Sequence, residues 1–203
     1  MPVTEIALLR LNKEVLLLST KAGLVGAQEA QSRHSNYQVH LLREIEDPAC
    51  IYLLGGWESI EEHMNDWIPS ETNQTLLQKL RGDLEVKWMF HLDIEPSTSQ
   101  IPLDAPILAI CRYFVDPKNK AEFDSVLKAA VPHLGAYTAL FTHDGGWRID
   151  KEGDDDEYVH FSGWNEVKDH VGFGESEGLK EFGKIKGLVK GVEIRHVRSE
   201  KWL

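Results

Sequence analysis

Two histidines stand at matching places in this chain of 203 residues, and their side chains could transfer protons. His63 follows Trp57, and His170 follows Trp164, at the same spacing (164 − 57 and 170 − 63 both equal 107). Histidine titrates near neutral pH, so an imidazole beside a ligand can take a proton from a phenol or an activated methylene. His63 and His170 are therefore candidate catalytic bases.

Other residues recur at a similar offset, which indicates that the chain contains two copies of one unit. His91 matches His196 (196 − 91 = 105), and Ala7 matches Ala109 (109 − 7 = 102). Short insertions and deletions in loops would make the offset drift in this way. Repeats in solenoids are about 20–50 residues long. A repeat of roughly twice that length predicts a duplicated fold, in which the residues that both copies share are the place to look for chemistry.

Large aromatic residues near the two histidines are the candidate substrate-binding residues. They are Trp57, Trp67 and Tyr37 in the first copy, and Trp164, Phe173 and Tyr137 in the second. An indole can stack on a ring, and a tyrosine hydroxyl can donate a hydrogen bond to a developing oxyanion. Tyr37 and Tyr137 are expected to begin the second strand of their copies. The alternative that the aromatic residues close a core, and that the histidines serve the fold, stays open.

The residues after the histidine differ between the copies and favour the second copy as the site of reaction. His63 precedes a bulky stretch with a proline, whereas residues 171–174 after His170 read Val-Gly-Phe-Gly. Glycine lets backbone approach a ligand, although it weakens a helix by about 1 kcal/mol. We therefore expect the active cavity to be in the C-terminal copy, lined by His170, Phe173 and Trp164.

The pattern of apolar residues predicts the order strand, helix, strand, strand, helix, strand in each copy. The first copy has predicted strands at 5–11, 37–44, 50–55 and 84–94, and helices at 13–23, 59–67 and 70–80. The second has predicted strands at 107–114, 137–143, 157–162 and 192–198, and helices at 120–131 and 166–185. This order is that of the ferredoxin-like split βαβ unit.

The segment 95–106 is polar and contains three prolines, which is typical of a linker. We predict an α+β protein with ferredoxin-like repeats at 1–94 and 107–203, separated by this linker. Each four-stranded sheet has its own helices on one face only. The other face also needs cover, so the two sheets are expected to face each other as an internal pseudo-twofold barrel.

The sequence between the third strand and the second helix of each copy resembles that of the dimeric α/β-barrel superfamily. Within it, the chain is most similar to the antibiotic biosynthesis monooxygenase (ABM) type, here as a tandem repeat. The residues that carry the resemblance are Trp57-Glu58-Ser59, Trp67 and Ser70, and in the second copy Gly163-Trp164, His170 and Ser176. The resemblance covers both copies.

For function, the resemblance implies a cofactor-independent monooxygenase acting on an aromatic or polyketide-like small molecule of secondary metabolism. Two alternatives remain open. One is a non-catalytic small-molecule-binding or stress-associated barrel. The other is a polyketide cyclase or decarboxylase that uses the same histidine without dioxygen.

No cofactor or metal is expected. Haem-degrading members of the superfamily have a haem-ligating histidine several residues after the serine that matches Ser70, and residues 74–77 contain none. The two cysteines, Cys50 and Cys111, do not form a CxxC pair, so no cysteine zinc site is indicated. No ligand spacing selects a metal site among the nine histidines.

Composition restricts the partners. The net charge is −11, and no basic stripe is present, which argues against binding to nucleic acid. No apolar run approaches the roughly 20 residues that cross a bilayer, and the first residues carry no basic leader before an apolar run. We expect a cytoplasmic protein without a membrane partner. Its duplicated unit would let a monomer form a pseudo-dimer by itself, and self-association stays open.

Overall fold

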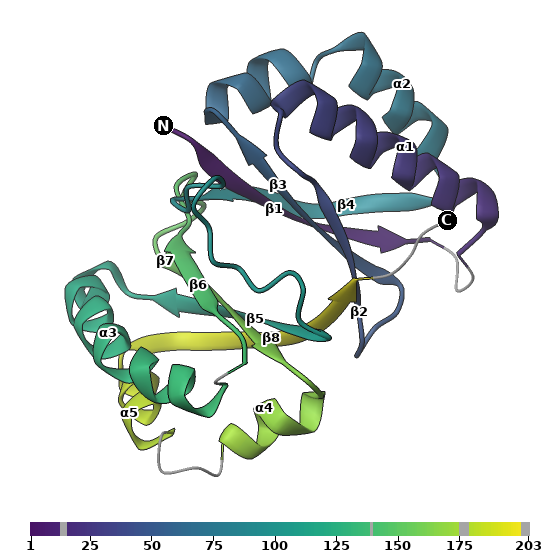
Figure 1. Cartoon of the computed structure of the whole chain (residues 1–203). Coiled ribbons are helices and arrows are strands. Elements are labelled where there is room, and N and C mark those ends of the chain that lie inside the picture. The colour runs from purple at the N-terminus through teal and green to yellow at the C-terminus, as the bar shows by residue number, and fades with distance from the viewer. Residues whose placement is uncertain (13–15, 139, 175–178, 200–203) are drawn as a thin grey trace. The chain divides into compact units, whose positions relative to one another are not determined.

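The computed structural model describes residues 1–12, 16–138, 140–174 and 179–199, which form two compact units (Figure 1). One unit consists mainly of Met1–Ser99, and the other is Gln100–Arg198. The division between them falls within the segment 95–106. No helix in the described ranges is long and apolar enough to cross a membrane.

The N-terminal unit is a four-stranded antiparallel sheet with its helices on one face (Figure 1). Its strands are β1 (Val3–Leu11), β2 (His40–Glu44), β3 (Cys50–Trp57) and β4 (Leu84–Leu92). Its helices are α1 (Leu18–Ser35), the short π-helix η1 (Glu62–Trp67) and α2 (Glu71–Leu80). The strands pair in the order β4-β1-β3-β2, which is the order of the ferredoxin-like fold.

The C-terminal unit repeats this plan. Its strands are β5 (Ile107–Val115), β6 (His143–Trp147), β7 (Asp156–Trp164) and β8 (Val189–Ser199). Its helices are η2 (Pro117–Asn119), α3 (Lys120–Tyr137), α4 (Val167–Phe173), α5 (Leu179–Gly183) and η3 (Lys184–Gly187). The sheet order is β8-β5-β7-β6. The prediction of an α+β protein of ferredoxin-like type is confirmed, while the pseudo-twofold barrel stays a prediction.

Alternation along the strands places one apolar row of each sheet under the helices. In the N-terminal unit, Leu9 and Leu11 of β1 pack with Leu24 of α1 and Leu80 of α2. Burying a leucine side chain contributes about 1.5–3 kcal/mol, so this row fixes which face of the sheet the helices cover. The same row continues along β1 to the candidate site.

Helix α1 differs from the predicted helix at 13–23. It begins at Leu18 and ends at Ser35, where Asn36 adopts a left-handed conformation with a φ of 61°. The sequence prediction took Gly23 as a helix end, but Gly23 lies inside α1. A Cβ atom added to Gly23 would lie 2.6 Å from Leu80 Cδ2, so this glycine lets α2 approach α1. The first residues of the predicted helix, 13–15, lie outside the described residues.

The predicted strand at 137–143 is wrong, since only its last residue lies in a strand. Helix α3 continues past Pro132 to Tyr137, and β6 begins at His143. Tyr37 also lies outside its predicted strand, because β2 begins only at His40. A proline inside a helix removes one backbone hydrogen bond, but α3 accommodates that loss and does not end there.

Packing against a glycine identifies the true counterpart of Tyr37. A Cβ atom on Gly56 would lie 2.6 Å from Tyr37 Cγ, and one on the equivalent Gly163 would lie 2.6 Å from Phe141 Cβ. Phe141 therefore takes the place of Tyr37 in the C-terminal unit, and the sequence match of Tyr37 with Tyr137 is incorrect.

Candidate functional site

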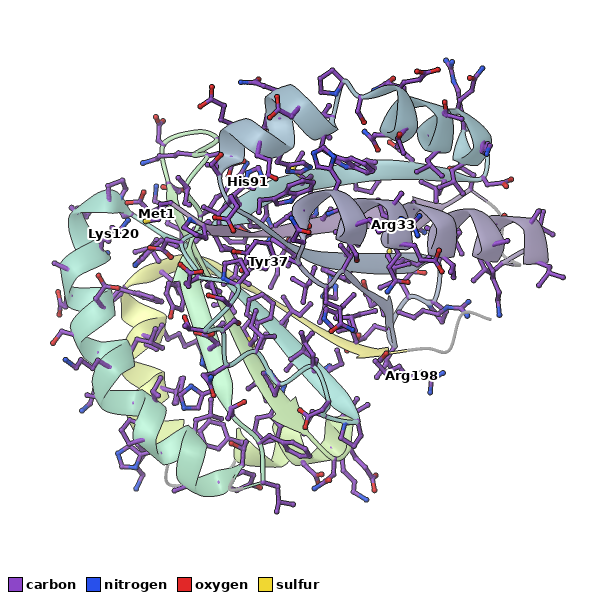
Figure 2. The ribbon with its side chains drawn as sticks, turned by 45° about the horizontal axis from the view of Figure 1, so that its top comes forward. Met1, Arg33, Tyr37, His91, Lys120 and Arg198 are labelled. Atoms are coloured by element: carbon purple, nitrogen blue, oxygen red, sulfur yellow. The ribbon has the colours of Figure 1, made fainter. Side chains whose placement is uncertain are left out.

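Two histidines of the N-terminal unit form a buried pair between the helices and the sheet. His63 comes from η1, and His91, labelled in Figure 2, comes from β4. His63 Nδ1 lies 2.7 Å from His91 Nε2, and both residues are almost completely buried. Trp57 stacks on His63 with a centroid distance of 4.2 Å and an interplanar angle of 8°. The imidazole of His63 is therefore fixed both in position and in orientation.

A buried carboxylate completes this cluster. Glu5 lies on β1 directly opposite His91, and it is 4% exposed. Its Oε2 atom accepts hydrogen bonds from Trp57 Nε1 at 2.9 Å and from Gln31 Nε2 at 2.7 Å. His63 Nε2 lies 3.8 Å from the same oxygen. Burial raises the pKa of Glu5, and the hydrogen bonds from Trp57 and Gln31 oppose this effect.

The residue opposite Glu5 on β3 makes room for these bonds. Gly55 pairs with Glu5, and a Cβ atom at Gly55 would lie 2.8 Å from Gln31 Nε2. Any larger residue would push the amide of Gln31 away from the carboxylate. The hydrogen bond between Gln31 and Glu5 thus depends on a glycine in the central strand.

The helix that carries His63 has an irregular hydrogen-bond pattern. The backbone N–H of Ile68 donates to the carbonyl of His63 at 2.9 Å, five residues earlier. Such π-type turns occur often at functional sites, because they redirect side chains. Here the turn carries both His63 and Trp67, which is buried against Trp57 at a centroid distance of 6.3 Å.

A cavity of about 150 Å³ adjoins the cluster, and Glu5, Gln31 and His63 all contribute to its wall. Gln28 and Asn73 also line it, and the remaining lining is apolar. An engineered apolar cavity of this size holds a benzene molecule. The arrangement therefore combines a space of about one aromatic ring in volume with a carboxylate and an imidazole at its polar end.

The C-terminal unit contains a second histidine pair of the same geometry. His170 of α4 and His196 of β8 are joined through Nδ1 and Nε2 at 2.8 Å. Trp164 stacks on His170 with a centroid distance of 4.7 Å and an angle of 20°. The aromatic clusters of the two units are therefore alike in their central three side chains.

The C-terminal cluster lacks the carboxylate. Ala109 lies opposite His196 and Ser162, as Glu5 lies opposite His91 and Gly55, so it occupies the place of Glu5. Trp164 Nε1 donates instead to Ser162 Oγ at 2.9 Å. The indole keeps a hydrogen-bond acceptor in both units, but only in the N-terminal unit is this acceptor an ionisable group.

The predicted binding residues of the C-terminal copy pack against one another. Phe173 is buried, with Tyr137 at 5.2 Å and Trp164 at 6.1 Å between ring centroids. A Cβ atom at Gly172 would lie 3.3 Å from the hydroxyl of Tyr137, which is about half exposed. Gly172 thus leaves room for the side chain of Tyr137. Ser176 lies outside the described residues.

Solved structures resemble the chain along nearly its whole length, although no family model matches the sequence and no curated protein is similar to it. A candidate monooxygenase from Fusobacterium nucleatum superposes with a TM-score of 0.66 at 12% identity, covering 98% of this chain and 93% of its own. A candidate chlorite dismutase gives 0.65 at 10% identity, covering 99% and 95%. An anthrone oxidase-like protein gives 0.57 at 10% identity, covering 98% and 91%.

The chain has the fold of the dimeric α/β-barrel superfamily. The resemblance that the sequence suggested is thereby confirmed for the fold. Identities of about a tenth carry no information on substrate or reaction, so the argument about chemistry rests on the residues of this chain.

Three predicted site residues of the N-terminal unit, Trp57, His63 and Trp67, are brought together in one cluster. Tyr37 lies apart from it, and its hydroxyl donates to Glu58 Oε1 at 2.7 Å. This bond to a carboxylate is the main reason that the pKa of Tyr37 rises to about 12. Tyr37 is therefore a poor proton donor near neutral pH.

The sequence interpretation missed Glu5 and Gln31 and treated His91 as a residue of the sheet. The signal for Glu5 was an acidic residue at an inward-facing position of an otherwise apolar strand, where an unpaired charge is costly. No group of three or more potential metal ligands is present among the described residues. Cys50 and Cys111 are free and buried.

Proposed function

We propose that this protein is a cofactor-independent monooxygenase-like enzyme for an aromatic or polyketide-like small molecule, and that its reaction takes place in the N-terminal cavity. The observation that carries the proposal is the placement of Glu5 and His63 on the wall of one largely apolar cavity. Oxidation is also the activity named for two similar structures, the candidate monooxygenase and the anthrone oxidase-like protein.

The cluster is suited to removing a proton from a weakly acidic carbon or phenol. Burial makes Glu5 a stronger base than an exposed carboxylate, since desolvation raises its pKa. His63, held by His91, can stabilise negative charge that develops on the substrate. The apolar lining strengthens both electrostatic effects because it excludes water.

The substrate anion then supplies the electrons for dioxygen. For an activated methylene, CH₂ and O₂ give C=O and H₂O, so the reaction balances without an added reductant. Glu5 takes the proton in the first step, and it returns a proton when the peroxide intermediate loses water. This role of one group as base and then acid is ordinary for a carboxylate near its pKa.

The C-terminal cluster is the second candidate site. His170, with Trp164, Phe173 and Tyr137 around it, has the histidine pair and the indole stack that favour such a role. Ala109 takes the place of Glu5 there, so His170 would have to act as base without a carboxylate beside it. We therefore place the reaction in the N-terminal unit, against the preference that the sequence suggested.

Oxygen uptake with a panel of one-ring phenols and 1,3-dicarbonyl compounds tests the proposal. Glu5→Gln should lower turnover about 10²–10⁴-fold, whereas His170→Ala, a change at the candidate base of the other unit, should have little effect. The reverse pattern would move the reaction to the C-terminal unit. Substrate conversion without oxygen uptake would favour a cyclase or decarboxylase, and binding without conversion would favour a non-catalytic barrel.

The remaining expectations from the sequence stay proposals. They are a cytoplasmic protein, a monomer with its two sheets facing each other in a pseudo-twofold barrel, and no nucleic-acid or membrane partner. The support for the barrel is the duplication of the unit and the fold it shares with the superfamily. A crystal structure with the sheets in another arrangement would refute it.

A further inference from the structure

The cavity of the N-terminal unit follows strand β1. Glu5, Ala7 and Leu9, alternate residues on one face of β1, all line it. At about 3.4 Å per residue, the backbone between Glu5 and Leu9 spans about 14 Å. A volume of about 150 Å³ spread over that length leaves a slender space. Such a space suits an extended chain better than a fused ring system.

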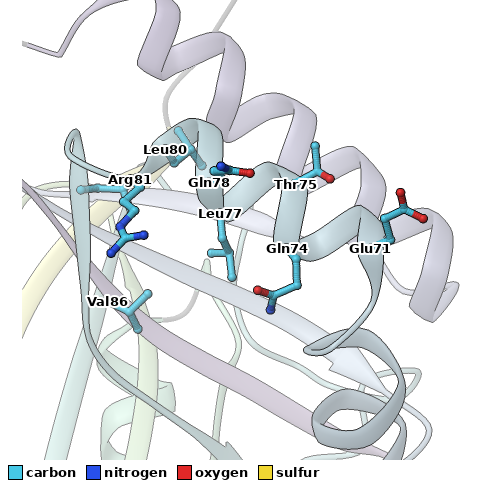
Figure 3. Close-up of a pocket in the computed structure, with 9 residues that line it drawn as sticks. Glu71, Gln74, Thr75, Leu77, Gln78, Leu80, Arg81 and Val86 are labelled. Atoms are coloured by element: carbon cyan, nitrogen blue, oxygen red, sulfur yellow. The ribbon is translucent and has the colours of Figure 1, made fainter.

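The end of the cavity away from Glu5 adjoins a surface groove of about 480 Å³ between α2 and β4 (Figure 3). Four apolar side chains line both the cavity and the groove: Leu77, Leu80, Leu84 and Val86. Figure 3 shows Leu77 projecting from α2 and Val86 from β4 into the groove. These two side chains are 41% and 48% exposed, so they can move aside to admit a chain.

One cation lies at this opening. Arg81 follows the last residue of α2, and its guanidinium extends into the groove (Figure 3). It forms no ion pair within the described part of the chain. Glu71 lines the groove as well, but it lies ten residues earlier along α2, about 15 Å away. In a protein with a net charge of −11, a guanidinium beside an apolar opening is suited to an anionic group.

We propose that the cavity and groove bind an elongated, mostly apolar molecule with an anionic head group, a carboxylate or a phosphate. The head contacts Arg81, the chain enters between Leu77 and Val86, and the far end reaches Glu5 and His63. Leu84 lies beside Arg81 and pairs with Leu11 of β1, which is six residues from Glu5 along the strand. The head group at Arg81 and the end of the ligand at Glu5 are therefore about 20 Å apart. The identity of that end as the reacting one rests on the proposed function.

Binding of dodecanoate, dodecyl phosphate and dodecanol, measured by calorimetry below their micelle concentrations, tests the proposal. Both anions should bind at least tenfold more tightly than the alcohol. Arg81→Gln should weaken the anions about tenfold and leave the alcohol unchanged. Lys79→Gln removes a charge from the same helix outside the groove and should change neither. The better of the two anions identifies the head group.

A second variant tests the route of entry. Leu77→Trp places a large side chain at the opening and should weaken the anions and the alcohol alike, by about tenfold or more, with an unchanged circular dichroism spectrum. If dodecanol binds the wild type as tightly as the anions do, or if none of the three binds, the inference is wrong.

Glu5→Gln separates this inference from the proposed reaction. It should bind dodecanoate as tightly as the wild type does, because a twelve-carbon chain with its head at Arg81 ends short of residue 5. Loss of oxygen uptake together with retained binding supports both ideas. Unchanged oxygen uptake in Glu5→Gln, with binding still sensitive to Arg81→Gln, would refute the reaction and leave the ligand class standing.

Discussion

Glu5 and Ala109 occupy the same place in the sheets of the two units, since each lies opposite a histidine that belongs to a histidine pair. A carboxylate stands at this place in one unit and a methyl group in the other. The neighbouring indole N–H has a hydrogen-bond acceptor in both units: Trp57 donates to Glu5, and Trp164 donates to Ser162. The two copies therefore share a frame of histidines and tryptophan and differ in the group that could act as a base.

Replacing Glu5 separates its electrostatic role from its structural role. Glu5→Gln keeps an oxygen for Trp57 Nε1, so the fold should be retained while turnover falls. Glu5→Ala copies Ala109 but leaves Trp57 and Gln31 without their acceptor. That should cost about 1–3 kcal/mol in the free energy of unfolding, measured by urea denaturation. Equal stability of Glu5→Ala and Glu5→Gln would show that the two hydrogen bonds contribute little.

The raised pKa of Glu5 predicts how stability changes with pH. Because the folded pKa lies above the model value of 4.5, the folded state holds this proton to a higher pH than the unfolded chain does. The stabilising contribution of Glu5 is thus complete below the unfolded pKa and is lost as pH rises through the folded pKa. The stability of Glu5→Gln relative to wild type should therefore increase between pH 4 and pH 8. A difference that is constant over this range would contradict the buried, desolvated carboxylate.

Activity should rise with pH over the range in which the contribution of Glu5 to stability is lost. A base must be deprotonated, so oxygen uptake should rise with pH through the raised pKa of Glu5. The rate at saturating substrate should show this rise as an acidic limb with its midpoint above 4.5. The residual activity of Glu5→Gln should lack that limb. An unchanged pH profile in the variant would assign the base to another residue, with His63 as the first choice.

The sequence predicted the order of strands and helices because apolar strands and helix-ending glycines are local signals. Gly82, with a φ of 93°, does end the segment that contains α2. Gly23 is also a glycine, but it lies inside α1 and allows α1 and α2 to pack closely. A glycine that allows a left-handed turn and one that allows two helices to touch look alike in a sequence, so the extent of α1 could not be read from it.

The candidate site was predicted only in the part that the two copies share. The matching of repeats found Trp57 and His63, because both have a partner of the same type in the second copy. The same method cannot find Glu5, because the equivalent residue of the second copy is an alanine, Ala109. It also aligned Ala7 with Ala109 at an offset of 102, whereas the strand pairing matches Glu5 with Ala109 at 104 (109 − 5). A shift of two residues keeps the same face of a strand, so the pattern of apolar residues could not reveal the error.

His160 of β7 predicts a stabilising substitution. Its Nε2 atom is buried and has no hydrogen-bond partner among the residues that the structure describes, and the counterpart in the other unit is Leu53 (160 − 53 = 107). Burial lowers the pKa of His160 from 6.5 to about 3. His160→Leu should raise the free energy of unfolding by about 1–3 kcal/mol at neutral pH, because it removes an unpaired polar atom.

The effect of His160→Leu should grow in acid. Between pH 6.5 and pH 3, His160 is protonated in the unfolded chain but stays neutral in the folded protein. The free energy of unfolding of the wild type therefore falls by up to about 1.4 kcal/mol for each unit by which the pH is lowered. Urea denaturation at pH 7 and pH 5 measures the difference, and Leu53→Val serves as a matched core change without a charge. A loss of stability in His160→Leu at both pH values would show that a ligand or ordered water pairs with Nε2.

Gly56 and Gly163 provide the last test, which concerns the correspondence of Tyr37 with Phe141. Gly163→Ala brings a Cβ atom to 2.6 Å from Phe141 Cβ, so it should cost about 1–3 kcal/mol by overpacking. The cost should shrink in a Phe141→Gly background, since the obstructing Cβ atom and ring are both gone, and Gly56→Ala should respond to Tyr37→Gly in the same way. Gly183→Ala meets no atom within 4 Å and should be neutral or stabilising. If the cost of Gly163→Ala is relieved by Tyr137→Gly and not by Phe141→Gly, the correspondence is wrong.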